Sequence, residues 1–243
     1  MSDLLPADFS IADGMAVLWL ILVWVCYGRF ADRLPPDDRA PKHLNEAMHQ
    51  IRRVWMRRML DRHDRIVDSS LTGHTVSSIG FFASTSMIII AGLLGLLGRI
   101  GAAQELINSW SFAVHTSEGL FQLKMLGLVA VFILAFYKFT WALRQYNFTC
   151  ALIGAAPLPP LEPKPRAAYA DQAARVLSLG VVSFNGGIRA FYFALAWLGW
   201  LIHPWVFVAA TTCMALILLR RQLRSPSQAA VMAYQEVFEV DRA

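Results

Sequence analysis

Five apolar runs constrain this sequence more than any other feature. They cover about residues 12–29, 76–98, 120–143, 184–202 and 205–219. A helix needs about 20 apolar residues to cross the hydrocarbon core of a bilayer, and the runs are of that order. Only 16% of the residues are charged, whereas about 25% is usual in soluble domains. Because backbone groups in lipid must bond within their own segment, the sequence predicts an all-α, polytopic transmembrane helical bundle of about five spans.

The segments between the runs differ in their content of Lys and Arg. Residues 1–27 contain none, and residues 28–75 contain ten. Residues 99–119 contain one, whereas residues 144–184 and 220–243 contain four each. Cytoplasmic loops of membrane proteins are rich in Lys and Arg. The alternation therefore predicts a multi-pass protein of the cell inner (plasma) membrane, with its N-terminus outside and its C-terminus in the cytoplasm.

Residues 1–243 are expected to form a single integral membrane domain. His203 and Pro204 interrupt the apolar sequence between the fourth and fifth runs. Proline removes a backbone donor and disfavours helix in the residue before it, so a tight turn between two paired helices is expected here. A re-entrant hairpin over about residues 203–219 is the alternative.

An arginine-rich segment over about residues 44–70 has no proline and many helix formers. It predicts a cytoplasmic amphipathic helix between the first and second spans. Trp55 lies on its apolar face, which is bordered by Arg58, Arg62 and Arg65. Such a helix is expected to rest on the inner leaflet, where its arginines meet the anionic headgroups of the lipid bilayer. An interface with another subunit and a ligand site are the alternatives.

Hydroxyl side chains are frequent in the second span. Ser70, Ser77 and Ser84 recur every seven residues, and Ser78 and Thr85 run beside them. Small residues let helices approach closely in lipid, and hydroxyl groups can form bonds between helices. The pattern predicts either a helix-packing seam or a hydrated pathway lined by these hydroxyl groups.

Four basic side chains lie inside or at the edge of two apolar runs: Lys124 near the start of the third run, and three others. Lys138 and Arg144 end the third run, and Arg189 lies in the fourth. By the predicted orientation, all three lie near the cytoplasmic boundary. Lys138 alone has a simpler explanation, because a lysine side chain can reach the interface by snorkelling. Amide and phenol side chains flank the three cations, namely Gln145, Asn185 and Tyr192.

Ionisable groups inside a membrane are costly and tend to face the interior of the bundle. Asp13 is expected to precede the first span, so no Asp or Glu is expected within a span. Asp68, at the foot of the second span, is the candidate counter-ion for the cations. Either Asp68 neutralises them in a structural network, or they bind an anion: a solute, a lipid phosphate or an acidic group of a partner.

Sequence motifs of catalysis and cofactor binding are missing. The chain has no His-Glu-x-x-His, Cys-x-x-Cys, Gly-x-Ser-x-Gly or phosphate-binding glycine loop. Cys26, Cys150 and Cys213 lie in or beside apolar runs, where they are expected to be small buried hydrophobic side chains. We expect no catalytic residue, no metal and no cofactor, and the sequence weighs against an enzyme. The net charge of +5 belongs to the loops, so no nucleic-acid partner is expected.

Several blocks of the sequence together resemble a known family. They are RRVWMRRMLDRHDRIVDSSL, FFASTS, YKFTWALRQYN, LIGAAP and FNGGIRAFYFALAW. These blocks resemble membrane proteins of the domain of unknown function 599 family, over roughly the first span to the sequence RRQLR. The resemblance implies a multi-spanning membrane protein and carries no activity or catalytic residue.

Two hypotheses of function follow from these residues. The first is an oligomeric channel or carrier for an anionic solute, in which Lys138 and Arg189 line a basic cytoplasmic vestibule with Arg144 at its rim. The second is a non-catalytic accessory or scaffold subunit of a membrane complex. A membrane enzyme that acts on lipid comes third, because paired acid and base groups are missing. A homo-oligomer or a subunit of a membrane complex is expected.

Overall fold

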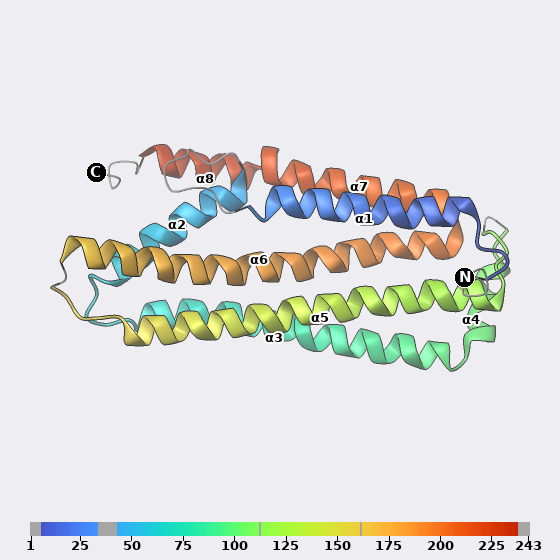
Figure 1. Ribbon diagram of the computed structural model, residues 1–243, viewed down its shortest axis with the longest axis horizontal. Coiled ribbons are helices and arrows are strands. Elements are labelled where there is room, and N and C mark those ends of the chain that lie inside the picture. Colours follow the sequence, from blue (N-terminus) through green and yellow to red (C-terminus); the bar gives the residue numbers. More distant parts are fainter. Residues whose placement is uncertain (1–5, 34–42, 112, 161, 238–243) are drawn as a thin grey trace. The chain divides into compact units, whose positions relative to one another are not determined.

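The described residues of the computed structural model are 6–33, 43–111, 113–160 and 162–237, and every regular element among them is an α-helix. This confirms the all-α prediction (Figure 1). In chain order, the helices are α1 (Ile11–Ala31), α2 (Leu44–Met59), α3 (Ile66–Leu97), α4 (Ile100–Asn108), α5 (Glu118–Ala155), α6 (Pro163–Ile202), α7 (Pro204–Arg224) and α8 (Pro226–Val237).

Five helices, α1, α3, α5, α6 and α7, are long and apolar enough to cross a membrane, which confirms the predicted number. The fifth apolar run belongs to one unbroken helix, α7, of 21 residues. At 1.5 Å per residue α7 is about 31 Å long, close to the thickness of the hydrocarbon core of about 30 Å. The chain turns between α6 and α7 at His203, directly before Pro204.

The helices extend beyond the apolar runs. The arginine-rich helix expected over residues 44–70 ends at Met59, and residues 66–70 belong to α3. The break has a local cause, because the carboxylate of Asp64 accepts a hydrogen bond from the backbone N–H of Ile66 at 2.9 Å and so caps the start of α3. The polar ends of the long helices are helical too, since helix formation does not require apolar side chains.

The contacts divide the chain into two compact units. Unit 1 consists of Met1–Gly28, Phe82–Tyr137 and Gly186–Ile217. Unit 2 consists of Arg29–Phe81, Lys138–Asn185 and Leu218–Ala243. Among the Lys and Arg side chains, only Arg99, Lys124 and Arg189 of the described chain belong to unit 1. The prediction of a single domain stays a prediction.

The core of unit 1 is rich in aromatic side chains. Trp197 and Trp200 meet edge to face with ring centroids 5.1 Å apart, and Phe207 stacks on Trp200 at 5.6 Å. The indole of Trp197 packs against Gly127 in space that only glycine leaves free, because a Cβ at position 127 would lie 2.2 Å from the indole. In this unit α1 and α7 run side by side (Figure 1), joined by a hydrogen bond of 3.0 Å from Trp19 Nε1 to Thr212 Oγ1.

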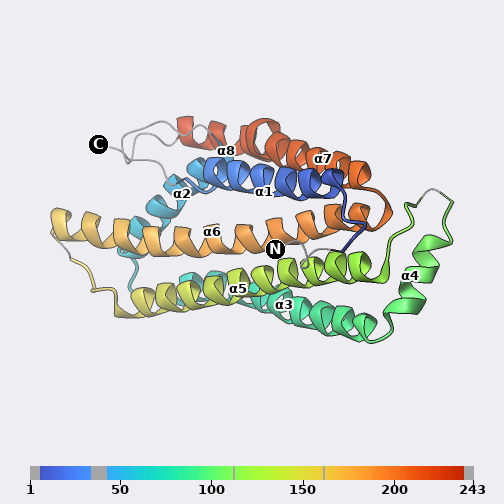
Figure 2. The ribbon, with the colours of Figure 1, turned by 45° about the vertical axis from the view of Figure 1, so that its right-hand side comes forward.

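Unit 2 contains α2, α8 and the polar ends of the long helices. Figure 2 shows α8 beside α2, and the two helices are in contact. His43 caps α2 by accepting a hydrogen bond from the backbone N–H of Glu46. Asn45 holds the same end of α2, because its side chain donates to the carbonyl of Ala31 at 2.9 Å and its backbone N–H donates to Gln222 at 3.3 Å. These bonds position the face of α2 that carries the candidate site.

Candidate functional site

A buried polar cluster in unit 2 is the strongest candidate site. We call it the Arg52 cluster; its members are His49, Arg52, Gln145, Tyr146, Ser178 and Ser183. Arg52 is only 8% exposed, and its Nε donates a hydrogen bond of 2.8 Å to the hydroxyl oxygen of Ser178. Nδ1 of His49 lies 2.7 Å from the same oxygen. Two nitrogen-bearing side chains of α2 therefore meet at one hydroxyl group of α6.

The periodicity of α2 explains why these side chains are buried. His49, Arg52, Met56 and Met59 are three or four positions apart, so they lie on one face of the helix, and all four are buried. The Trp55 face, expected to be the apolar face of this helix, is only partly buried. Sequence reasoning therefore missed Arg52 and His49, although their spacing with the two methionines was a usable signal.

Helices α5 and α6 supply the remaining members. Ser183 donates to Oε1 of Gln145 at 2.7 Å, and both residues are buried. The ring of Tyr146 packs against Gly180, where a Cβ would lie 2.9 Å from the ring. Tyr146 is close enough to Arg52 for the two groups to interact electrostatically. Gly180 thus makes room for the aromatic ring next to the buried guanidinium.

Arg52 has neutral partners. Within the part of the chain that the structure describes, no carboxylate bonds to it or acts on its charge. Burial lowers the pKa of the Arg52 guanidinium to about 10, so it stays protonated at neutral pH. A buried charge without an opposite charge is costly, which makes the cluster a place where an anion would be stabilised.

The neighbouring arginines of α2 differ from Arg52, because they have carboxylate partners. Arg53 forms two bonds of 3.0 Å with the carboxylate of Asp171, and Arg57 lies 3.6 Å from the same group. Arg166 of α6 pairs with Asp61 just after α2. These ion pairs hold α2 against α6. Their arginines are engaged by carboxylates and are therefore less available to a ligand or a partner.

Two of the three arginines predicted to meet lipid headgroups, Arg62 and Arg65, have partners inside unit 2. Arg62 donates to Oδ1 of Asp68 at 2.6 Å, and Trp55 donates to the same oxygen at 2.6 Å. Arg65 donates to backbone carbonyls at the end of α5. Arg58 is exposed. Contact of this helix with the membrane surface stays a prediction.

Asp68, the predicted counter-ion, is fully buried. Its Oδ1 accepts the bonds from Trp55 and Arg62, and its Oδ2 has no partner among the described residues. The negative charge of Asp68 therefore balances the positive charge of Arg62. Lys138 and Arg144 are exposed, and the guanidinium of Arg144 lies 5.9 Å from the ring of Phe148.

Arg189 is 7% exposed, and its guanidinium lies 5.5 Å from the ring of Tyr27. Asn185 and Tyr192 are half-buried. Lys138 belongs to unit 2 and Arg189 to unit 1, so their convergence in one vestibule stays a prediction.

The three serines with a spacing of seven, Ser70, Ser77 and Ser84, are exposed. Ser77 and Ser78 donate to backbone carbonyls four residues earlier in α3, at 3.1 and 3.2 Å. Thr85 is half-buried. The hydroxyl groups of Ser77 and Ser78 are therefore satisfied within α3. The role of the whole set as a packing seam or a pathway stays a prediction.

A second polar cluster lies in unit 1 and corrects one expectation. Asp13 belongs to α1 and is only 4% exposed, although no acid was expected within a span. Its Oδ2 accepts a bond from the backbone N–H of Ser10, and its Oδ1 accepts one from Trp200 at 2.6 Å. Lys124 is 2% exposed, and its ammonium lies 5.5 Å from the ring of Trp200. The spacing of Ser10 and Asp13 is that of a capping box, a signal that was available in the sequence.

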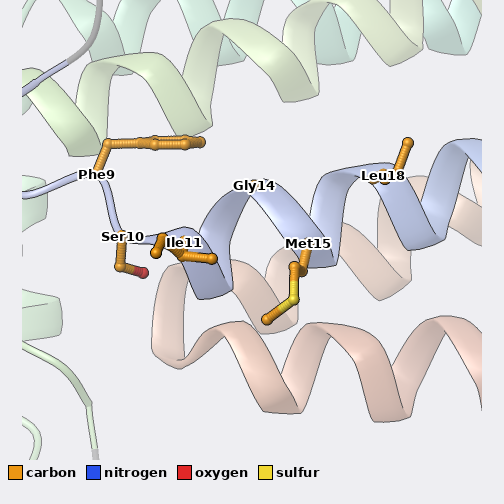
Figure 3. A pocket seen from close by; sticks show the side chains of 6 residues that line it. All are labelled: Phe9, Ser10, Ile11, Gly14, Met15 and Leu18. Atoms are coloured by element: carbon orange, nitrogen blue, oxygen red, sulfur yellow. The ribbon is translucent and has the colours of Figure 1, made fainter.

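The beginning of α1 also lines a shallow, open depression, shown in Figure 3. Its lining is apolar except for Ser10 and offers no charged group.

No group of three or more potential metal ligands occurs among residues 6–33, 43–111, 113–160 and 162–237. Cys26, Cys150 and Cys213, which were expected to be buried, are exposed free thiols in the single chain. Neither the depression nor the thiols compete with the Arg52 cluster as a site.

A family model matches residues 15–227, and its description reads "Protein of unknown function, DUF599". The chain belongs to the DUF599 family. The matched range of this DUF599 protein contains every member of the Arg52 cluster, whereas Asp13 lies just before it. Searches of curated proteins and of solved structures gave no match.

Proposed function

We propose that this multi-pass membrane protein is a channel or carrier for an anionic solute, and that the Arg52 cluster is where the anion binds. One observation carries the proposal: the buried guanidinium of Arg52 is held by Ser178 and has no carboxylate partner among the described residues. Arg53, the next residue, has such a partner in Asp171. The difference marks Arg52 as the cation of α2 that is available to a ligand.

The electrostatic argument concerns the cost of burial. Moving a guanidinium out of water costs several kcal/mol, and hydrogen bonds to neutral groups offset only part of it. An anion at the Nη atoms of Arg52 would supply the missing charge.

The proposed orientation places the cluster on the cytoplasmic side, because α2 follows the first span and the basic loops belong to the inside. Lys138 and Arg144 are exposed on the half of α5 that also carries Gln145. We assign them to a basic vestibule that attracts anions toward the cluster by a long-range field.

The alternative is an accessory subunit whose arginine-rich helix binds a partner. Intramolecular bonds of Arg53, Arg62 and Arg65 weaken this alternative, because those side chains are already engaged within unit 2. Purification in mild detergent separates the two: a foreign subunit in a fixed ratio would favour the accessory function.

Anion flux from liposomes tests the proposal. Purified protein would be reconstituted with acetate, phosphate or chloride inside the vesicles, and Arg52→Gln would be compared with Arg58→Gln, at an exposed position of the same helix. We expect flux through the unsubstituted protein, a large loss with Arg52→Gln and little change with Arg58→Gln. Flux equal to that of protein-free vesicles for every anion, or unchanged in Arg52→Gln, would overturn the proposal.

A further inference from the structure

The geometry of Arg52 contains information about the shape of its ligand. The guanidinium has five N–H donors in a plane, and the bond from Nε to Ser178 fixes one edge of that plane. The hydroxyl of Ser178 is itself held by His49 at 2.7 Å. The remaining donors, on Nη1 and Nη2, form a fork with a fixed direction.

A fork of two parallel N–H donors matches two oxygens of one anion. Carboxylates and phosphates accept such bonds in pairs, whereas a halide is a single point and gains nothing from the second donor. A site selected only for charge could use lysine equally well. The use of arginine with one edge anchored therefore favours an oxyanion over a halide.

The charge of the cluster limits the charge of the ligand. Arg52 is its one guanidinium. Nearby, Arg53 pairs with Asp171, and Arg57, which shares that carboxylate, is 37% exposed, so solvent screens its charge. A singly charged ligand would balance the cluster, whereas a doubly charged one would bring an uncompensated negative charge into a buried place.

We propose that the ligand is a singly charged group with two equivalent oxygens, held by Nη1 and Nη2 of Arg52. This inference rests on the proposed function and specifies its substrate class. The group is a carboxylate or a phosphodiester, and it belongs either to a free solute or to a lipid headgroup.

Ligand-dependent stabilisation tests the shape of the anion. The detergent-purified protein would be titrated at constant ionic strength with sodium acetate, sodium dimethyl phosphate or sodium chloride, and the thermal unfolding midpoint followed. We expect saturable stabilisation by acetate or dimethyl phosphate and none by chloride. Arg52→Lys keeps the charge and removes the fork, so its affinity is expected to fall about tenfold or more. Arg58→Lys, at an exposed position of the same helix, is the matched control and keeps the affinity of the unsubstituted protein.

A second arm identifies the source of the group. Native mass spectrometry after exchange into phosphatidylglycerol would show retained lipid in the unsubstituted protein and loss of it in Arg52→Lys. If lipid is retained and the soluble probes do not raise the unfolding midpoint, the bound group is a lipid headgroup. If the soluble probes raise the midpoint, the bound group belongs to a solute. If Arg52→Lys does not fold, Ser178→Ala replaces it, because it releases the anchored edge of the guanidinium and is also expected to weaken binding.

The outcomes separate this inference from the proposed function. Equal stabilisation by chloride, or an Arg52→Lys variant with unchanged affinity, overturns the oxyanion fork while Arg52-dependent flux still supports anion transport. Absence of any saturable binding, to the probes or to lipid, overturns the inference outright. Absence of flux in the liposome experiment, with binding of phosphatidylglycerol intact, refutes transport and leaves a lipid site.

Discussion

Arg53 and Asp171 face each other across α2 and α6, with Nε and Nη2 of the arginine each 3.0 Å from one carboxylate oxygen. Two parallel charge-assisted bonds fix both the distance and the direction between the helices. Arg52, one position earlier, points to Ser178 instead. Adjacent residues of the same type thus have different tasks: Arg53 orients α2, and Arg52 remains as a buried cation.

The Arg53–Asp171 pair gives a first prediction. Asp171→Asn removes the charge and one half of the paired bonds, and unfolding should become easier by about 1 kcal/mol, because the side chains are 15% and 29% exposed and solvent screens part of the attraction. Denaturant unfolding in detergent micelles measures the change. Glu105→Gln, at an exposed position outside this pair, controls for loss of charge. An equal effect there would contradict a specific role of the pair.

Gly180 gives a second prediction. In Gly180→Ala the new Cβ would lie 2.9 Å from the ring of Tyr146, so the ring must shift, and a loss of about 1–3 kcal/mol is expected. Gly73→Ala in α3 is the matched control, because nothing lies within 4 Å of its Cβ and alanine favours helix. The midpoints of thermal unfolding of the two variants provide the test. Similar midpoints would contradict tight packing between Gly180 and Tyr146.

His43 gives a third prediction, on pH. Burial lowers the pKa of His43 below its usual 6.5, although the neighbouring Glu46 partly opposes the shift. The folded protein therefore resists protonation, and the unfolded chain binds the proton first. The stability from the neutral cap is complete above about pH 6.5 and is lost as the pH falls toward the folded pKa.

His43→Asn isolates this effect, because asparagine is also a good helix cap and does not titrate. Unfolding free energies between pH 7.5 and pH 5 would be compared for the two proteins. The difference between them should grow in favour of the asparagine variant as the pH falls. Parallel curves would exclude His43 as a source of acid sensitivity.

Trp200 gives a fourth prediction. Trp200→Phe keeps most of the ring packing but removes the N–H that bonds to Asp13 at 2.6 Å. A buried carboxylate oxygen that loses its donor costs about 1–3 kcal/mol. Trp19→Phe loses a bond to Thr212 at a more exposed position and should cost less. The midpoints of thermal unfolding of the two variants provide the test. A larger loss with Trp19→Phe than with Trp200→Phe would contradict a stabilising bond between Trp200 and Asp13.

The spanning helices could be predicted because apolar runs report directly on burial in lipid. Their full lengths could not, since α3 begins at Ile66 and α5 continues to Ala155 through residues that hydropathy alone does not distinguish from loops. The break between α2 and α3 lies inside a segment whose composition favours helix throughout, and Asp64 caps the helix that starts after it.

The candidate site was predicted only in part. Gln145 was named from its place beside the cations, and it belongs to the Arg52 cluster. Arg52 was missed because its partner Ser178 lies 126 positions away, and charge patterns within α2 carry no information about α6. For the same reason Asp68 could be named as a counter-ion, but its pairing with Arg62 required the turn that brings α2 back to the start of α3.

Arg65 occupies a position with a mechanical consequence. Its guanidinium bonds to the carbonyls of Ile153, Ala156 and Pro157, where α5 ends and its dipole is negative. The linker that joins α2 to α3 is thereby tied to the tip of α5, and tilting of that tip would be transmitted to the helix that carries Arg52. A rearrangement at one end of α5 would thus be felt at Arg52, although Arg65 itself makes no contact with the cluster.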